Sequence, residues 1–557
     1  MDNYFVSSCK RVKDWICRQF GQKEKKTVHH KKLADGGEVI VWETGRAGEE
    51  AASYENLFLR KEIAGFRTNI RREQSCSIKS LTRDYLYKQL LSSGEYTFDH
   101  MLVIKDPYGE APLTALALFM LEEPACVRVT TKGNLKVTDF VTELPKKKEH
   151  RVPILGMYAE KANDIVIEIL DDEGNCVKSH TFTIRTKRLP KSLRNVITVK
   201  KWTDKPAYSN IMINGGVKIH TCVFDIEGKI RYYLSRKPRG YGIFPLSDGH
   251  FFYMEKYISV PSYSNPQTVE SYDMDYFGRV FRTYLTEKGV HHTAEEKAGG
   301  NILTGSNSML EHTEDCVIEI DRQTGEIVWQ LNMAELFDET YQNMMDWCHV
   351  NSAAYYEKDR TILISLRNVH AVICVDYDTK KLRWILSDPK FWEGTKMTPY
   401  LLQPEGDVKW CYQQHAAFEI ALPDESNPQK KRIIVYDNHW AKRRKAKSFD
   451  KDPLSYVSFY DIDEEKKTVS LHKRFAGPKT RIRANGIYVP DKKRVYNMAG
   501  SYAEPVDGDG GGIFEYDYET GEVLSEFGVK PGFFRAYPFE PNVQELAEPM
   551  QVTGDYQ

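Results

Sequence analysis

The stretch Asp321-Arg-Gln-Thr-Gly-Glu-Ile-Val-Trp329 decides the fold, because it describes a strand end, a tight turn and the start of a second strand. An Asp at the start of a turn can accept hydrogen bonds from the backbone N–H groups that follow it. Gly325 suits the left-handed backbone that such turns need. The stretch therefore predicts a β-hairpin.

The same hairpin pattern recurs six times, with Gly or Lys at the turn, starting at Asp225, Asp275, Asp321, Asp376, Asp461 and Asp517. The copies are spaced roughly 59 residues apart on average, which suits four-stranded units with long loops. We therefore expect an all-β fold whose main part is a six-bladed β-propeller over residues 205–530. An irregular pair of β-sandwiches with coincidental turns is the alternative.

The rest of the chain organises around this repeat region, because 557 residues exceed what one hydrophobic core normally serves. Residues 1–95 are expected to form a charged, partly helical lead-in, with an amphipathic helix over 77–92. Residues 96–190 alternate in short strand-like runs and predict a small N-terminal β-sandwich domain. The basic stretch 185–201 is expected to be a linker, and 531–557 a C-terminal tail.

Composition excludes several classes of function. Lys and Arg number 78 against 79 Asp and Glu, so there is no overall basic excess to drive nucleic-acid binding. The most apolar stretch, Leu113–Leu121, is too short to cross a bilayer, so no membrane insertion is expected. Charged Lys10, Arg11, Lys13 and Asp14 interrupt any secretory signal. We expect a cytoplasmic protein, or an exported one if a leader has been removed.

The ten cysteines are scattered, with no CxxC pair and none of the spacings of a zinc site. We therefore expect reduced thiols and no structural metal.

A second pattern recurs between the hairpins: a polar residue, a short turn and an apolar strand that ends near an Asn. In the middle copies the polar residue is a histidine, at His291 and His292, at His349 and at His415, and Arg367 ends the strand after His349. Equivalent positions of a radial repeat face the same axis, so these side chains are expected to converge. Which of His291 and His292 faces the channel is open. The alternative is a set of separate histidines that cap strands.

Three imidazoles could bind zinc, but an arginine beside them argues against a cation. A guanidinium instead suits a tetrahedral oxyanion such as sulfate or phosphate. With an anion bound, an imidazole nitrogen could act as a nucleophile and give a covalent histidine intermediate with ping-pong kinetics. The sequence has no P-loop and no dinucleotide fingerprint, so no nucleotide or other cofactor is expected.

Four motifs at these positions resemble the bacterial arylsulfate sulfotransferase family: Asp346-Trp-Cys-His349-Val-Asn351-Ser352, Arg367-Asn368, Gln414-His415 and Asp437-Asn438. Asp106–Leu113 and Val152–Tyr158 resemble that family's small N-terminal β-domain, so the resemblance covers about residues 100–530. It implies a six-bladed propeller that moves a sulfuryl group from a phenolic sulfate ester to another phenol, without a nucleotide donor.

The resemblance also implies a role for each residue. His415 matches the histidine that becomes transiently sulfurylated, and His349 matches a histidine that contacts the transferring group. Asn351 and Arg367 match the polar and cationic partners of that group. His292 matches the remaining channel histidine.

Two positions depart from the family pattern. Ala416 follows His415, and Thr293 follows His292, where relatives commonly carry an acid. The groups that orient the imidazoles are therefore open.

The expected partners are a small aryl sulfate donor and a phenolic acceptor, and Tyr241, Phe244 and Trp392 are candidates for the wall around the donor ring. Homo-oligomerisation is open. Two rival functions are kept: a histidine-dependent phosphoryl or sulfuryl hydrolase, and a non-catalytic propeller that scaffolds partners.

Overall fold

The computed structural model describes residues 28–34, 36–52, 54, 75–216, 218–236, 241–258, 267–308, 312–342, 344–422, 427–440 and 452–550. Much of the predicted lead-in, residues 1–27 and 55–74, lies outside this set. The chain divides into two compact units, Met1–Lys187 with Tyr276–Phe281 and Val543–Gln557, and Arg188–Asp275 with Arg282–Asn542. Among the described helices, none is long and apolar enough to cross a membrane.

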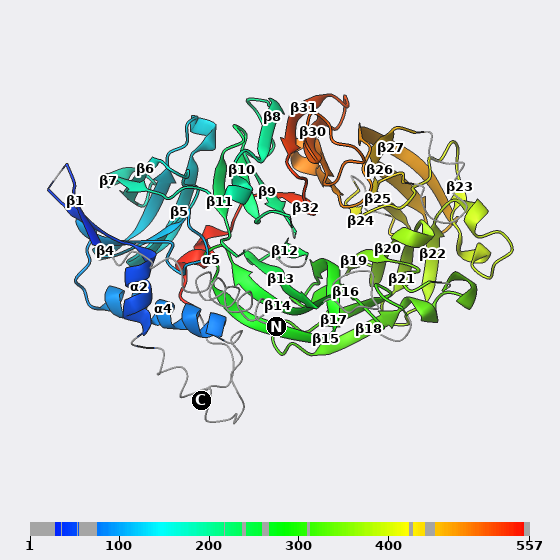
Figure 1. Cartoon of the computed structure of the whole chain (residues 1–557), viewed down its shortest axis with the longest axis horizontal. Helices are drawn as coiled ribbons and strands as arrows, with labels where there is room; N and C mark the ends of the chain where they lie inside the picture. The colour runs from blue at the N-terminus through cyan, green and yellow to red at the C-terminus, as the bar shows by residue number, and fades with distance from the viewer. Residues whose placement is uncertain are drawn as a thin grey trace, which may run out of the picture. The chain divides into compact units, whose positions relative to one another are not determined.

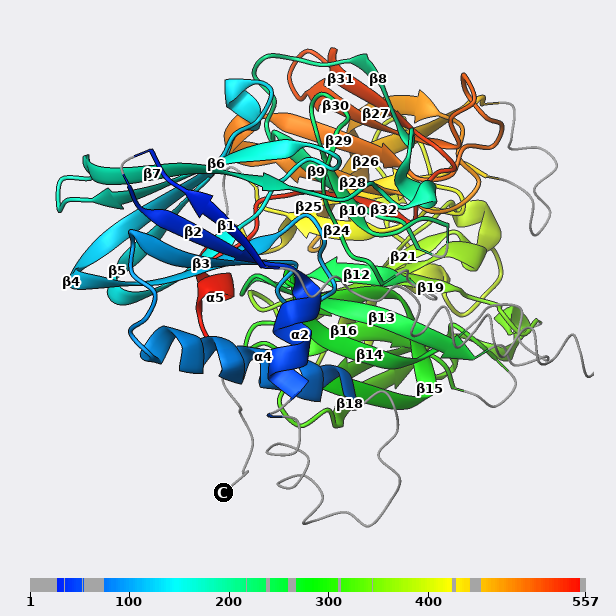
Figure 2. The ribbon, with the colours of Figure 1, turned by 60° about the vertical axis from the view of Figure 1, so that its left-hand side comes forward.

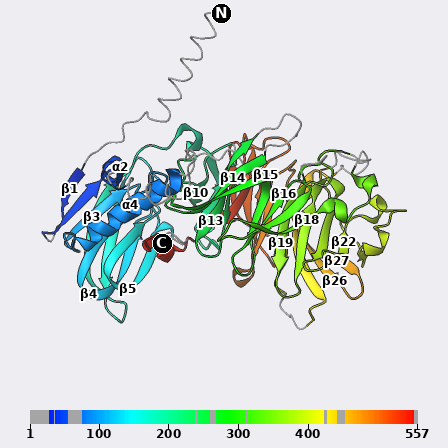
Figure 3. The same cartoon turned by 90° about the horizontal axis from the view of Figure 1, so that it is seen from below.

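The first unit is built on one mixed sheet with short helices. Its elements are β1 (Val28–Lys32), β2 (Glu38–Trp42), α2 (Thr44–Ala52), α4 (Ser75–Ser92), β3 (His100–Lys105), β4 (Ala115–Thr131), β5 (Phe140–Ile154), β6 (Ala162–Leu170), β7 (Cys176–Arg185) and α5 (Val543–Ala547). The strand order is β1-β2-β3-β4-β6-β7, and β5 also pairs with β4. A helix forms at the predicted position as α4, which lies against β4 (Figure 3), but the separation of apolar and polar faces is weak in this segment. Strands β1 and β2 extend the sheet from within the predicted lead-in (Figure 2).

The second unit holds five sheets among the described residues, arranged around a common centre (Figure 1). Their strands are β8 (Ile197–Lys201), β9 (Asn210–Asn214), β10 (Cys222–Asp225), β11 (Ile230–Tyr233), β12 (Gly242–Pro245), β13 (His250–Ile258), β14 (Gln267–Asp275), β15 (Val280–Glu296), β16 (Ile302–Ser306), β17 (Cys316–Ile320), β18 (Ile327–Asn332), β19 (Val350–Tyr356), β20 (Thr361–Leu366), β21 (Ala371–Asp376), β22 (Leu382–Leu386), β23 (Gln403–Pro404), β24 (Ala417–Ile420), β25 (Lys430–Asp437), β26 (Leu454–Asp463), β27 (Thr468–Pro478), β28 (Asn485–Val489), β29 (Arg494–Ala499), β30 (Gly511–Asp517), β31 (Val523–Val529) and β32 (Arg535–Pro538).

The sheet orders are β11-β10-β9-β32, β12 through β18 in sequence, β19 through β22 in sequence, β23-β27-β26-β25-β24, and β28-β29-β30-β31-β8. The all-β class and the propeller-like arrangement are therefore confirmed. The number of blades stays a prediction, because one of the five sheets has seven strands.

The hairpin turns form as the repeat predicts. Asp321 Oδ1 accepts hydrogen bonds from the backbone N–H groups of Gln323 and Thr324, each at 2.8 Å. The turn position is left-handed in all six copies, at Gly228, Gly278, Gly325, Lys380, Lys467 and Gly521. In the fifth copy the predicted capping residue is wrong. Asp463, not Asp461, accepts from the turn N–H of Lys466, at 3.0 Å, while Asp461 pairs with Arg432.

Two stretches expected to lie outside the propeller supply strands to it. The predicted linker contains β8, which pairs with β31 at the edge of a sheet. The predicted tail contains β32, which pairs with β9. Both strands are short, four and five residues, so their alternation is too brief to detect in the sequence. Backbone pairing across the sheet stabilises them.

Candidate functional site

The structure brings the three predicted histidines together. His292 lies in β15, His349 directly precedes β19, and His415 precedes β24 by two residues. The ring centroids of His292 and His349 are 4.7 Å apart, and those of His292 and His415 are 6.0 Å apart. All three side chains are buried.

The backbone at these positions has an unusual conformation. The φ angle is +57° at His292, +56° at His349 and +71° at Ala416, which places each in the left-handed region. The pairing of β15 with β16 and of β19 with β20 shifts register at the same places. Bulges of this kind redirect side chains, and strained backbone collects at functional sites. Here they turn the imidazoles toward one another.

His349 is bracketed by two buried carboxylates. Its Nδ1 atom lies 2.6 Å from Glu314 Oε2 and 3.0 Å from Asp346 Oδ2. Burial alone would lower the pKa of this imidazole, but the two negative charges outweigh it and raise the pKa to about 9. His349 is therefore a cation at neutral pH. Glu314 was missed by the sequence analysis, because it comes from a different strand connection and lies in no shared motif.

His292 is a neutral imidazole between an aromatic ring and a cation. Its ring centroid lies 4.4 Å from that of Tyr241, and its Nδ1 atom lies 3.7 Å from Glu314 Oε1. Burial, and next the positive charge of His349, hold the pKa of His292 well below its ordinary value. His291 instead contacts the backbone carbonyl of Ser306 through Nε2, at 2.9 Å. Of this pair, His292 is the one that joins the cluster.

His415 is held by a backbone carbonyl. Its Nδ1 atom lies 2.8 Å from the oxygen of Ala484, and the N–H of Ala484 lies farther away, at 3.3 Å. Because a carbonyl only accepts, the shorter contact places the proton on Nδ1 and leaves a lone pair on Nε2. Burial, then the charge of Arg535, keep the pKa of His415 well below its usual range. The imidazole is neutral and nucleophilic at Nε2.

Arg367 lies beside this histidine, at the end of β20. Its guanidinium donates to Gln413 Oε1 at 3.1 Å, to Asn368 Oδ1 at 3.2 Å and to the carbonyl of Arg481 at 3.4 Å. All three acceptors are neutral. The same charge is one of the causes that lower the pKa of His415.

Asn351 is fully buried and supports the backbone next to His415. One of its amide N–H groups donates to the carbonyl of Gln414 at 2.8 Å, and its Oδ1 atom has no hydrogen-bond partner among the described residues. The predicted role of Asn351 in substrate binding stays a prediction. The contact seen here positions the segment that carries His415.

Arg535 is a second buried arginine that the sequence analysis missed, because it lies in the stretch expected to be a tail. Its guanidinium donates to the backbone carbonyl of Asn351 at 2.8 Å and lies 3.7 Å from Glu295 Oε1. Burial raises the pKa of Glu295 to about 7, against the opposing charge of Arg535.

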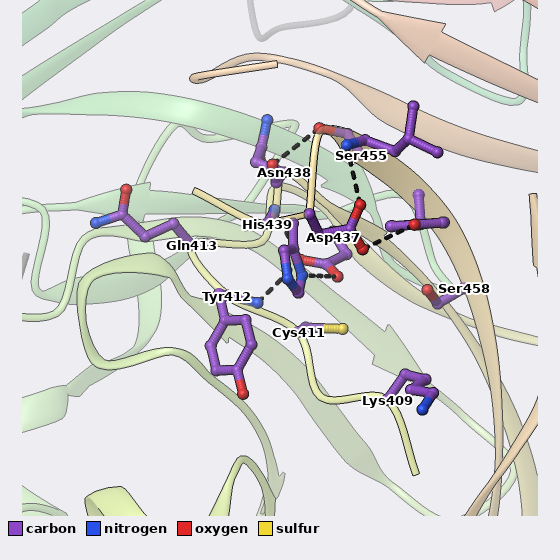
Figure 4. Close-up of polar contacts among 12 residues, drawn as sticks. Lys409, Cys411, Tyr412, Gln413, Asp437, Asn438, His439, Ser455 and Ser458 are labelled. Carbon is purple, nitrogen blue, oxygen red and sulfur yellow. Dashed lines mark hydrogen bonds and ion pairs between the residues drawn. The ribbon is translucent and has the colours of Figure 1, made fainter. Parts of the chain in front are cut away.

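The Asp437-Asn438 motif anchors the loop before His415 (Figure 4). Asp437 Oδ1 accepts from the N–H of Tyr412 at 2.9 Å and from the N–H of His439 at 2.8 Å. Its Oδ2 atom lies 3.0 Å from His439 Nδ1 and 3.2 Å from a guanidinium nitrogen of Arg474. This carboxylate therefore holds the ends of two segments in register.

Of the three aromatic candidates, Tyr241 lies at the histidine cluster. It packs at 5.3 Å from Phe534, whose ring is 5.8 Å from that of His415. Phe244 belongs to a hydrophobic core cluster, and Trp392 packs in another core against Tyr341. Phe534 is a further aromatic residue of the site that no motif indicated.

Two groups of three side chains in the described residues could hold a metal ion: His291, His292 and Glu314, and Glu314, Asp346 and His349. In the second group, the protonated imidazole of His349 already pairs with both carboxylates. A cation there would also have to displace the proton of His349. The expectation that the site holds no metal stays a prediction.

Comparisons with known proteins give the following similarities. The family model described as arylsulfotransferase (ASST) matches residues 195–535, and one described as the arylsulfotransferase Ig-like domain matches residues 102–187. The arylsulfate sulfotransferase AssT of Lelliottia amnigena is 21% identical, and that of Escherichia coli strain CFT073 is 22% identical, each over 77% of this chain and 90% of the relative. Among solved structures, a protein of unknown function from Bacteroides caccae matches with a TM-score of 0.38 and 11% identity, over 59% of this chain and 98% of that chain.

Proposed function

The chain belongs to the arylsulfotransferase family of aryl-sulfate sulfotransferases, and from this premise we propose that it moves a sulfuryl group from an aryl sulfate to a phenol in two displacements, with His415 as the nucleophile. One observation carries the proposal. The Nδ1 proton of His415 is held by the Ala484 carbonyl, so that a neutral imidazole presents the Nε2 lone pair beside two cations, His349 and Arg367.

In the first displacement, the Nε2 lone pair of His415 forms a bond to sulfur while the bond between sulfur and the aryl oxygen breaks. The departing phenolate takes the proton of His349, whose pKa of about 9 lies close to the value of about 10 for a phenol. Such a match favours proton transfer in either direction. The intermediate is a sulfohistidine at His415.

In the second displacement, a new phenol returns a proton to His349 as its oxygen attacks sulfur, and the bond between nitrogen and sulfur breaks. The proton that His349 gives up in the first displacement is replaced by the proton of the acceptor phenol in the second, so no other acid or base is required. The reaction is of the ping-pong type. It uses no nucleotide and no cofactor, because both the donor and the acceptor are simple phenol derivatives.

Arg367 and the protonated His349 are proposed to bind the sulfuryl oxygens. By analogy with phosphoryl transfer, the transition state is loose and spreads negative charge over these oxygens. Fixed positive groups then contribute more than proton transfer does. Asn351 is proposed to complete the pocket while it positions the backbone of Gln414.

We propose that the second unit has six blades, as the repeat predicts. The 17-residue strand β15 lies between β14 and β16 in the seven-stranded sheet. Its pairing with β16 begins only at Val290. Strand β15 would thus serve as the outer strand of one blade and the innermost strand of the next, so that this sheet counts as two blades.

The test uses 4-nitrophenyl sulfate with and without added phenol, following nitrophenolate absorbance and the intact mass of the protein. A transferase releases one equivalent without phenol, carries one sulfuryl adduct, and turns over when phenol is added. A hydrolase turns over without an acceptor. A scaffold gives neither colour nor adduct, and either of these last results would disprove the proposal.

A further inference from the structure

Two cations of the second unit, Arg483 and Lys218, have no carboxylate partner among the residues that the structure describes. Both are half-buried. The Nζ atom of Lys218 donates to the carbonyl of Pro531 at 3.0 Å. The guanidinium of Arg483 makes no hydrogen bond or ion pair with another described residue. Most arginines of this unit that lie near the protein interior are paired, as Arg322 is with Asp273.

Arg483 lies in the segment 481–484, whose backbone carbonyls contact both Arg367 and His415. The carbonyl of Arg481 accepts from Arg367 at 3.4 Å, and the carbonyl of Ala484 accepts from His415 at 2.8 Å. Arg483 stands between these two contacts. Its φ angle of +62° is close to the +56° of His349, and it precedes β28 much as His349 precedes β19. Its side chain therefore starts from a backbone position like that of the site histidines.

Lys218 reaches the same region through the segment 531–534. The N–H of Phe533 donates to the carbonyl of Gly500 at 2.8 Å. A Cβ atom on Gly500 would lie 2.7 Å from the carbonyl oxygen of Phe533 and 3.3 Å from that of Arg483, so both backbones pack closely on this glycine. Burial lowers the pKa of Lys218, and the positive charge of Arg483 lowers it further.

Two like charges that approach each other out of bulk water destabilise a fold unless an anion compensates them. Arg367 and His349 are already proposed to bind the transferred sulfuryl group. Arg483 and Lys218 are therefore available to bind a second anionic group. The rings of Tyr241 and Phe534 pack against each other at the histidine cluster, and the charge of Arg483 acts on Tyr241. These rings suit the face of an aromatic substrate. The planar fork of an arginine fits a carboxylate well.

We propose that Arg483 and Lys218 bind a carboxylate carried by the aromatic substrate, so that the preferred acceptors are phenols with a carboxylate on the ring or on a short side chain. This inference deepens the proposed function and rests on it for the orientation of the ring.

The test measures binding and turnover separately, with acid and amide pairs of nearly equal shape. Binding of 4-hydroxybenzoate, 4-hydroxyphenylacetate and 3-(4-hydroxyphenyl)propanoate is compared with that of their carboxamides by titration calorimetry. At least one acid is expected to bind about tenfold more tightly than its amide, since hydrogen bonds to charged groups are the stronger ones. Arg483→Gln and Lys218→Gln should each reduce that ratio, and Arg483→Glu should favour 4-hydroxyphenethylamine instead.

Arg481→Gln is the matched control, because the side chain of Arg481 is exposed and pairs with Glu504 at 2.8 Å. It should retain the acid preference. Equal affinity for every acid and its amide overturns the inference, whether or not the protein transfers sulfate. A carboxylate preference that depends on Arg483, in a protein that releases no nitrophenolate with any acceptor, supports the carboxylate site and refutes the proposed function.

Discussion

The Nδ1 atom of His415 lies 2.8 Å from the carbonyl oxygen of Ala484, a residue 69 positions later in the chain. Ala416, which has no ionisable group, follows this histidine. The backbone carbonyl fixes the tautomer without adding a negative charge next to the imidazole. Burial, and next the charge of Arg535, hold the pKa of His415 low against the effect of the Ala484 contact, so that Nε2 stays unprotonated.

Replacing His415 with Asn is expected to abolish sulfuryl transfer, because the amide lacks the Nε2 lone pair. Neither a burst of nitrophenolate nor a sulfuryl adduct should form with 4-nitrophenyl sulfate. The control is His472→Asn, which changes a partly exposed histidine that contacts Tyr518 away from the cluster. Full turnover by the His415→Asn variant would show that another group is the nucleophile.

The carboxylates around His349 should set the alkaline limit of activity. The acid that protonates the leaving phenolate has a pKa of about 9, so the rate should fall as the pH rises through 9. Glu314→Gln removes one negative charge and lowers the pKa of His349, so this limb should move to lower pH. The measurement is kcat against pH with a slow aryl sulfate. An unchanged alkaline limb in Glu314→Gln would exclude His349 as the acid.

The same shift affects stability, and its sign can be worked out. His349 has a raised pKa in the folded protein, against about 6.5 when unfolded. Its contribution to the free energy of unfolding is therefore fully present below pH 6.5 and is lost as the pH rises through about 9. Thermal unfolding of the wild-type protein and of His349→Gln should differ in this window, with the wild-type advantage smaller at pH 9.5 than at pH 6. A constant difference between the two proteins would contradict the raised pKa.

The sequence predicted those features that depend on local patterns. The hairpins starting at Asp321 and Asp376 could be read because a turn needs a capping oxygen and a left-handed residue a few positions apart. The convergence of His292, His349 and His415 followed from the repeat, since equivalent positions of a radial fold lie around one axis. These inferences required no knowledge of side-chain contacts.

The partners of the histidines could not be predicted, because they come from distant segments without a shared motif. Glu314 approaches His349 from the connection before β17, and Ala484 acts through a backbone atom that every residue has. Arg535 lies on β32, whose four residues form a strand only because β9 provides pairing for them. Contacts of this kind are set by tertiary packing and not by local sequence.

Removing the guanidinium at Arg367 should slow the chemical step. Loss of one charged group that stabilises a transition state typically costs about 10²–10³ in rate, so Arg367→Gln is expected to lower kcat/KM by that order. Arg360→Gln is the matched control, because Arg360 is an exposed arginine paired with Asp378. If Arg367→Gln lowers kcat/KM by less than about threefold, Arg367 does not bind the sulfuryl oxygens in the transition state.

The Asp437 carboxylate should contribute to stability more than to chemistry. It is fully buried. It accepts from the backbone N–H groups of Tyr412 and His439, and it pairs with the side chains of His439 and Arg474. Asp437→Asn keeps the shape but leaves the buried edge of Arg474 without its countercharge, and breaking such a pair typically costs about 3–5 kcal/mol. The expected result is a lower Tm, with the exposed Asp378→Asn as the control. We then measure kcat with saturating substrate at a temperature below the Tm. Asp437→Asn should lower kcat far less than His415→Asn does, because Asp437 acts only by positioning the loop that carries His415. A variant with an unchanged Tm and no activity would instead assign Asp437 a direct part in the reaction.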